Sequence, residues 1–314
     1  QESRGLGDVY RRQNQYIMRE KSIKCVCLGL GLNLCGLAAC SSQEETLPDN
    51  QPFLITSSIQ GVSLSRAPHL DASGKGKFTD GDVNTLFFMG KDGRFIKDFS
   101  YTYGHTYYWN DVQLKEVGQE LKVSACYPTV AAPNPAAFSW DVTDTSAATA
   151  DFLAAAPATV QEGVTIQVPL QFTHLMHRFI VQLQADGTTV SDGDLAKTQV
   201  TISSFLPQAQ INLLTATVQG VAGLPAQLHT QGTEAHFILP PQAVGNIEVK
   251  IAVGERTQNF RLSDLKVGDS PLTTLESGKA FTLAVKVSKN SFSITGQSIG
   301  PWGNQGEANG EIIL

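Results

Sequence analysis

Two histidines, His174 and His177, stand three residues apart and are the first side chains in this sequence that could do chemistry together. Imidazole nitrogens are common ligands of zinc. The stretch around them, from Phe172 to Leu183, is mostly apolar and favours a β-strand. Along a strand, a spacing of three directs side chains to opposite faces, so the two rings are not expected to share a metal ion.

A second candidate is the acidic stretch Asp80, Asp82 and Asn84, which begins like a calcium-binding loop. Such a loop needs glycine at its sixth position and a bidentate carboxylate at its twelfth. Thr85 and Lys91 occupy those positions, which excludes an EF-hand. The sequence also lacks the motifs of serine hydrolases, phosphate-binding loops and zinc proteases. We therefore expect no enzymatic activity, no cofactor and no metal.

Cys40 offers a different chemistry, the acylation of a thiol. It follows a basic head at residues 18–24, a mostly apolar run from Cys25 to Leu37, and the small residues Ala38 and Ala39. The apolar run is too short to cross a bilayer as a helix and is typical of a secretory signal. The residues ending at Cys40 resemble the lipobox of bacterial lipoproteins, in which the cysteine carries the lipid. This resemblance implies a palmitate-bearing outer membrane lipoprotein exposed at the cell surface.

The leader divides the N-terminal region into three expected parts. Residues 1–17 form a doubtful upstream extension, residues 18–39 a signal peptide, and residues 40–52 a flexible tether. The cysteines other than Cys40 and Cys126 lie in the leader, so we expect no internal disulfide. The chain has a formal net charge of −6, which argues against nucleic acid as a partner.

After the tether, apolar and polar residues alternate in short runs bounded by glycine, proline, asparagine or aspartate. This pattern predicts β-strands. The first strand begins at Phe53 and continues to Leu64, with a bulge at Gly61. Further strands are predicted at residues 83–89, 94–101, 106–109, 121–127, 164–170, 172–183, 198–202, 211–218, 235–239, 247–253, 258–262, 280–287 and 291–294.

Only one short helix is predicted, over residues 145–156, with Asp144 as its cap and Pro157 at its end. Strands and helices do not alternate, so the fold class is all-β with antiparallel sheets. The turn at Asp186 divides the folded part into an N-terminal β-sandwich domain, residues 53–185, and a C-terminal one, residues 186–314.

The aromatic residues leave two interpretations open. On an exposed face they would form a platform for sugar rings, as in a surface glycan-binding lipoprotein; otherwise they fill the cores of the sandwiches. A hydrolase whose carboxylates have no sequence signature also stays open. The aromatic residues concerned are Trp109, Trp140, Trp302, Tyr101, Tyr103, Tyr107 and Tyr108.

Nine short motifs, including the lipobox, occur in an order that resembles the fimbrillin family, the subunits of type V pili of Gram-negative anaerobes. The resemblance spans nearly the whole chain after Cys40. The other motifs are Ser65-Arg66-Ala67, Thr79 to Asp82, Val123 to Pro128, Ala150 to Ala154, Phe172-Thr173-His174, Phe237 to Gln242, Gly278 to Leu283, and Ser298 to Trp302.

The resemblance implies two transthyretin-like antiparallel β-sandwich domains in tandem and a role in a pilus. It also implies that an arginine-specific protease cuts between Arg66 and Ala67, which removes the first strand. The groove left behind accepts a strand from another fimbrillin subunit, in a homopolymer or a heteropolymer. The removed strand would carry the apolar residues Phe53, Ile55, Val62 and Leu64.

Two details leave the exact role in a pilus open. A possible C-terminal strand has only Ile312 and Leu314 as apolar anchors on one face, which is short for a donated strand. It would instead close the sheet of the second domain. An anchor or accessory subunit that keeps its lipid and its first strand is therefore an alternative, and surface ligands of host or bacteria are possible partners.

Overall fold

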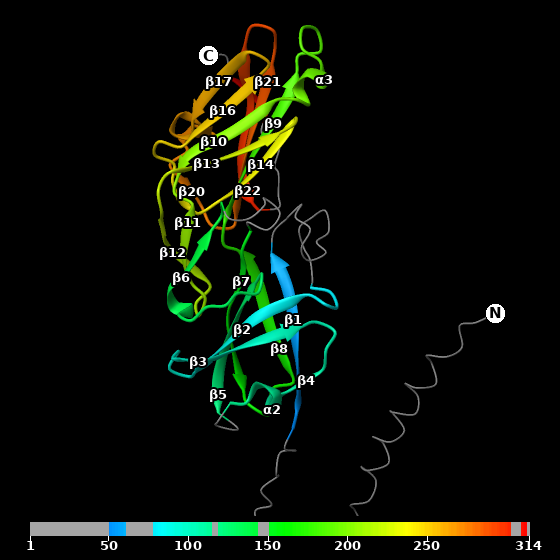
Figure 1. Ribbon diagram of the computed structural model, residues 1–314, viewed down its shortest axis with the longest axis vertical. Helices are drawn as coiled ribbons and strands as arrows, with labels where there is room; N and C mark the ends of the chain where they lie inside the picture. The colour runs from blue at the N-terminus through cyan, green and yellow to red at the C-terminus, as the bar shows by residue number, and fades with distance from the viewer. Residues whose placement is uncertain (1–49, 61–77, 115–118, 144–150, 303–308, 313–314) are drawn as a thin grey trace, which may run out of the picture. The chain divides into compact units, whose positions relative to one another are not determined.

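The structure is a computed structural model that describes residues 50–60, 78–114, 119–143, 151–302 and 309–312. Within these residues the fold is all-β, as predicted (Figure 1). The helical elements are single turns, and no described helix is long and apolar enough to cross a bilayer. They are α2 (Trp109–Val112), α3 (Asp192–Leu195), and the 3-10 turns Pro135–Ala137 and Leu262–Asp264.

A seven-stranded sheet is formed from the first half of the chain, in the spatial order β3-β2-β5-β7-β8-β1-β4. Neighbouring strands are antiparallel except β1 and β8, which run parallel and side by side (Figure 1). The strands are β1 (Pro52–Gln60), β2 (Val83–Gly90), β3 (Phe95–Thr102), β4 (Tyr107–Tyr108), β5 (Glu120–Tyr127), β7 (Leu153–Gln161) and β8 (Gln167–His174).

Two further sheets contain most of the remaining strands, in the orders β14-β9-β21-β22-β23 and β13-β10-β16-β17. Their apolar faces share one core, as in a β-sandwich. The strands are β9 (His177–Ala185), β10 (Gln199–Phe205), β13 (Ala226–Gln231), β14 (Glu234–Leu239), β16 (Glu248–Val253), β17 (Arg256–Arg261), β21 (Lys279–Val287), β22 (Phe292–Pro301) and β23 (Asn309–Ile312).

A three-stranded sheet, β12-β11-β6, joins strands from both halves of the chain. In it β6 (Phe138–Asp141) pairs with β11 (Gln208–Asn212), which also pairs with β12 (Thr217–Ala222). The remaining pairs are short: β15 (Gln242–Ala243) with β20 (Thr274–Leu275), and β18 (Lys266–Val267) with β19 (Ser270–Pro271).

The buried apolar side chains form two clusters. One lies on the seven-stranded sheet and contains the buried residues of β1. The larger one contains residues of both halves, such as Phe87 and Phe152 from the first and Ile211 and Phe281 from the second. The first half therefore contributes to both clusters.

The predicted helix over residues 145–156 is wrong where the structure describes it, because β7 begins at Leu153. Ala156 and Pro157 together lie opposite the single residue Ser124 of β5, where the register shifts. A bulge of this kind accommodates a proline, which has no N–H to donate to the ladder. The pairing with β5 thus overrides the helix-forming alanines.

Other differences concern where strands end and how they run. Residues 172–183, predicted as one strand, form the end of β8 and most of β9, and residues 211–218 contain the turn between β11 and β12. Strands β6 and β13 were not predicted. The antiparallel prediction is wrong for two pairs, β1 with β8 and β9 with β21.

The strand β9 lies before the predicted domain boundary at Asp186. It pairs with β14 on one side and with β21 on the other. By its hydrogen bonds β9 therefore belongs with strands of the second half, and β8 is the last strand of the seven-stranded sheet.

Candidate functional site

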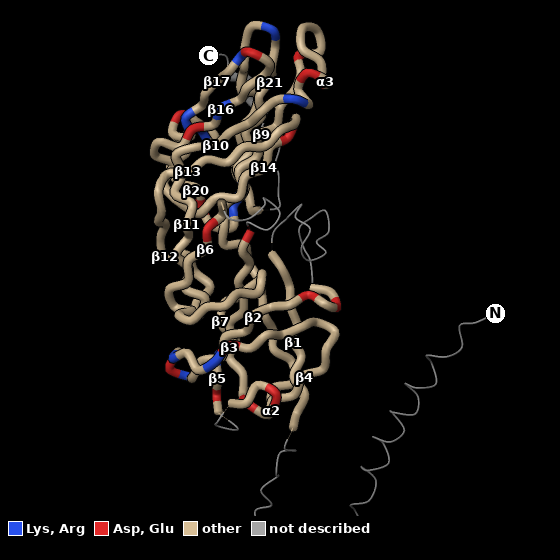
Figure 2. Tube along the Cα trace, in the orientation of Figure 1, with Lys and Arg blue, Asp and Glu red and all other residues tan. Residues whose placement is uncertain are grey.

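β1 forms a strand with one buried face because its apolar residues alternate with others. Phe53, Ile55 and Ile59 are 2–4% exposed, whereas Leu54 between them is 48% exposed. A period of two places the three buried side chains on the same face. β1 contains no charged residue and is tan along its whole length in Figure 2. It therefore supplies one uncharged apolar row to the core.

The two edges of β1 are held differently. On one edge, Leu54–Gln60 pairs with Gln167–Thr173 of β8 in a parallel ladder. On the other edge, β4 pairs only with Pro52 and Phe53. Parallel ladders are slightly less stable per residue than antiparallel ones. Among the described strands, β8 alone therefore forms a ladder with β1 from Leu54 onward.

Phe53 lies within a group of aromatic rings that we call the aromatic cluster. Its ring centroid is 5.1 Å from that of Trp109 and 6.1–6.2 Å from those of Phe99, Tyr101 and Tyr107. Aromatic pairs in tilted arrangements contribute about 0.5–1.5 kcal/mol beyond their buried area. The aromatic cluster therefore fixes the beginning of β1.

Two residues of the aromatic cluster also hydrogen bond to the backbone near β1. The Tyr101 hydroxyl accepts a hydrogen bond from the Ile55 N–H at 3.3 Å. The Trp109 N–H donates to the Gln51 carbonyl at 3.0 Å, and its indole N–H donates to the Thr165 carbonyl at 2.9 Å. Burial raises the pKa of Tyr101, so this hydroxyl keeps its proton across the physiological pH range.

Two of the residues predicted for the removable first strand lie in β1, namely Phe53 and Ile55, and both are buried. Ile59 belongs to the same buried row and fits the same alternation, although it was not among the residues predicted for the removable strand. Tyr101 and Trp109 were missed as neighbours of β1, because contacts across strands leave no local pattern. The other predicted site residues lie outside the described residues: Cys40, Val62, Leu64, Arg66, Ala67 and Leu314.

Ile312 is the last residue of β23. This strand pairs with β22, where Ile312 lies opposite Ile294 and Asn309 opposite Gly296. β23 is therefore an edge strand of the five-stranded sheet of its own chain.

His174 and His177 are bound to different partners. His174 Nδ1 lies 2.8 Å from Asp151 Oδ2, and its ring stacks on that of Trp302 with a centroid distance of 4.4 Å. His177 Nδ1 lies 2.9 Å from the Glu276 carbonyl, and burial lowers the pKa of His177 to about 4. No three His, Cys, Asp or Glu side chains of the described residues are grouped to hold a metal ion.

The interpretation of the aromatic residues as a sugar-binding platform is wrong for four of them, because their side chains are buried. Trp109 and Trp302 are only 3% and 2% exposed, and Tyr101 and Tyr103 are buried too. Stacking on a sugar needs an exposed ring face, which these side chains lack. Of the tyrosines in that group, Tyr108 is exposed, at 38%. The buried rings instead fill the two hydrophobic clusters.

Comparison with known proteins shows which fold and family these features belong to. A proposed cell adhesion protein from Bacteroides uniformis matches with a TM-score of 0.61 at 18% identity, over 81% of this chain and 98% of that chain. Another from Bacteroides ovatus matches with a TM-score of 0.58 at 18% identity, over 81% and 99%. At this level of sequence identity, the two matches show that the chain shares the fold of these proteins.

Sequence comparison adds the family. A proposed fimbrium subunit from Bacteroides uniformis, Fim1C, is 34% identical over 96 residues, which are 30% of this chain and 32% of the relative. The chain therefore matches about a third of that relative's length. The model of the fimbrillin-like family matches residues 71–302, most of the chain and nearly all of the fold after β1. The chain belongs to the fimbrillin-like family.

Proposed function

We propose that this chain is a structural and adhesive subunit of a cell-surface pilus, exported as a lipoprotein on Cys40 and assembled by strand donation after its first strand is removed. Membership of the fimbrillin-like family and the relative described as a fimbrium subunit support the pilus role. One observation supports the strand donation: β1 supplies an apolar row to the core but pairs along most of its length with β8 alone.

The apolar surface that β1 buries is large enough that its loss would destabilise the fold unless another strand took its place. Burying one large apolar side chain stabilises a fold by about 1.5–3 kcal/mol, so Phe53, Ile55 and Ile59 together contribute roughly 5–9 kcal/mol. The net stability of a whole domain is about 5–15 kcal/mol. Removal of β1 would expose an apolar groove and the unpaired edge of β8. An alternating apolar strand from another subunit restores both by β-augmentation.

The proposed partners follow from this cycle. An arginine-specific protease cuts between Arg66 and Ala67, and a strand of another fimbrillin subunit then occupies the groove of β1. Before the cut, the lipid on Cys40 holds the precursor at the outer membrane. After it, the subunit belongs to the fimbrium.

Substitution at the cut site tests the cycle. Arg66→Ala and Arg66→Lys should both leave a lipidated monomer, because an arginine-specific protease accepts neither side chain. The control is Arg261→Ala, which removes an exposed arginine from β17 and should leave assembly unchanged. Assembly is measured by electron microscopy of surface fibres and by gel analysis of the polymer. Fibres of normal length from Arg66→Ala would contradict the proposal.

A second candidate role is that of an anchor or accessory subunit that is never cut. The aromatic cluster and the hydrogen bonds of Tyr101 and Trp109 bind β1 well to the fold, which favours this role. So does β23, because it pairs within its own chain. Such a subunit would keep both its lipid and its first strand on the cell surface.

A further inference from the structure

A cavity of about 630 Å³ lies at the turn between β2 and β3, and none of its lining residues belongs to β1 or the aromatic cluster. We call it the hairpin cavity. Small-molecule sites in proteins commonly have volumes of about 300–1,000 Å³. Its lining combines apolar, polar and charged side chains, among them Arg94, Ile96, Lys97, Gln119, Leu121 and Glu162.

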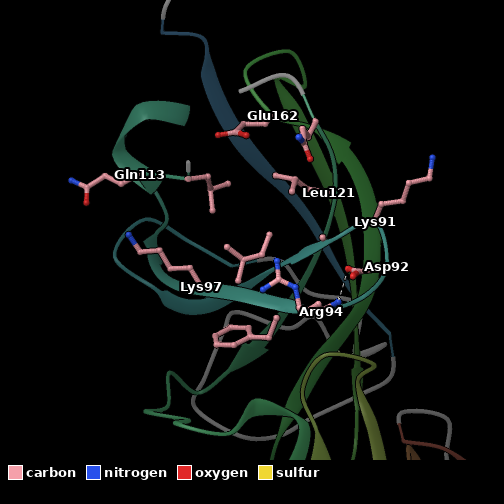
Figure 3. Close-up of a pocket in the computed structure, with 12 residues that line it drawn as sticks. Lys91, Asp92, Arg94, Lys97, Gln113, Leu121 and Glu162 are labelled. Carbon is pink, nitrogen blue, oxygen red and sulfur yellow. Dashed lines mark hydrogen bonds between the residues drawn. The ribbon is translucent and has the colours of Figure 1, made fainter. Parts of the chain in front are cut away.

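Arg94 is the cation best placed to bind a ligand in the hairpin cavity. Figure 3 shows its guanidinium directed toward the middle of the lining residues, whereas Lys91 points away from them. Two of the nearby acids have other partners: Asp92 accepts a hydrogen bond from the backbone N–H of Arg94 at 3.0 Å, and Glu120 lies 3.5 Å from the Lys91 ammonium. Within the described residues the Arg94 guanidinium has no ion pair.

A guanidinium with no ion pair among the described residues favours a particular kind of ligand group. It carries five N–H donors in a planar fork, which matches the two oxygens of a carboxylate. Lys97 adds a second positive charge, and its ammonium is held in place because it donates to the Val112 carbonyl at 2.8 Å. This side of the hairpin cavity therefore favours a carboxylate.

The rest of the lining favours hydroxyl groups and an apolar surface. Leu121, which is 4% exposed, and the exposed Ile96 both line the cavity and supply its apolar surface. Glu162 is on the opposite side from Arg94 in Figure 3, and its backbone N–H donates to the Gln119 carbonyl at 3.0 Å. A carboxylate has about four acceptor sites, so Glu162 can accept hydrogen bonds from a ligand besides its existing interactions.

We propose that the hairpin cavity binds an acidic sugar. Its carboxylate pairs with Arg94, its hydroxyls donate to Glu162 and hydrogen bond to the Gln119 amide, and the C–H face of the ring lies on Leu121 and Ile96. The lining comes from several separate segments of the chain, which suits a compact ligand better than an extended peptide strand. The site is independent of strand donation, since β1 takes no part in it.

The test compares D-glucuronate with D-glucose, which differ only in the carboxylate, by NMR titration of the purified full chain. Glucuronate should bind at least about ten-fold more tightly than glucose, the scale of one charge-assisted hydrogen bond. Hexanoate, a carboxylate without hydroxyls, should bind more weakly than glucuronate. Equal binding of glucose, binding of hexanoate as tight as that of glucuronate, or no binding of glucuronate at millimolar concentration would overturn the proposal.

Two variants locate the binding. Arg94→Gln should weaken glucuronate binding by about ten-fold or more and leave the weak glucose binding unchanged. Arg261→Gln is the matched control, because it makes the same substitution at an exposed arginine of β17 that does not line the cavity. Both side chains are exposed, so near-ultraviolet circular dichroism should show unchanged folds. Unaltered glucuronate binding by Arg94→Gln would overturn the assignment.

Discussion

At the scale of single residues, Phe53 has the densest surroundings in β1, with four aromatic rings around it. Phe53→Ala leaves a cavity in the aromatic cluster and should lower the free energy of unfolding by about 3–5 kcal/mol. Urea unfolding of the uncut chain measures this change. The control is Leu54→Ala, whose side chain is 48% exposed and should change stability by no more than about 0.5 kcal/mol. Equal effects of the two variants would contradict the buried position of Phe53.

His177 makes the stability depend on pH. Burial holds the pKa of His177 at about 4 in the folded protein, below the ordinary histidine value of about 6.5. As the pH falls from about 6.5 to about 4, the unfolded chain gains a proton on this histidine and the folded chain does not. This group should therefore cost about 2–4 kcal/mol of stability across that range, and no more below it.

The variant His177→Gln tests the pH dependence, because glutamine does not titrate. Its unfolding free energy should fall less between about pH 7 and pH 4 than that of the parent chain. Leu54→Ala, which removes no titratable group, is the control and should keep the parent's pH profile. A His177→Gln profile parallel to that of the parent would contradict this assignment.

At the scale of elements, the alternation of Phe53, Ile55 and Ile59 was enough to predict β1 and its buried face. The partner of β1 was not predictable, because a parallel ladder with β8 joins residues more than a hundred positions apart. For the same reason the alanines before Pro157 suggested a helix, whereas pairing with β5 makes them a strand with a bulge. Local patterns thus predicted most strands, but not which strands pair.

The cavity site around Arg94 could not be predicted from the sequence for the same reason. No motif joins Arg94, Leu121 and Glu162, which lie in different segments. The tryptophans to which the sequence pointed as possible sugar-binding residues include two that the fold buries. Burial and cavity shape depend on strand pairing, which the sequence pattern does not give.

Locking β1 to β8 tests whether the strand must leave for assembly. Ser58 of β1 lies opposite Gln171 of β8, and both are exposed. Neighbouring strands are about 4.8 Å apart, within the range for a disulfide between paired positions. The double variant Ser58→Cys/Gln171→Cys should fold normally but form no fibres when oxidised, and reduction should restore assembly.

The control for this experiment is a disulfide in another sheet. Thr201→Cys/His229→Cys joins β10 to β13 at paired positions and should leave assembly unchanged. Cys126 is buried and should not interfere. Fibre formation by the oxidised β1–β8 variant would show that assembly does not need release of β1.

At the scale of the whole molecule, the two halves of the chain are joined through a shared sheet and a shared core. β6 pairs with β11, and the Ser124 hydroxyl donates to the Leu213 carbonyl at 2.8 Å. We propose that two structural halves meet between β8 and β9, about ten residues before the boundary predicted at Asp186. The groove of β1 then lies entirely within the first half, on a sheet that the second half supports through the larger cluster.

The central claim is that the first strand is removed before the subunit joins a pilus. Intact mass and N-terminal sequencing of the protein from the native cell surface test it most directly. The account predicts a chain that begins at Ala67 and carries no lipid. A chain that begins at an acylated Cys40 and still contains β1 would contradict it and would identify an uncut anchor or accessory subunit instead.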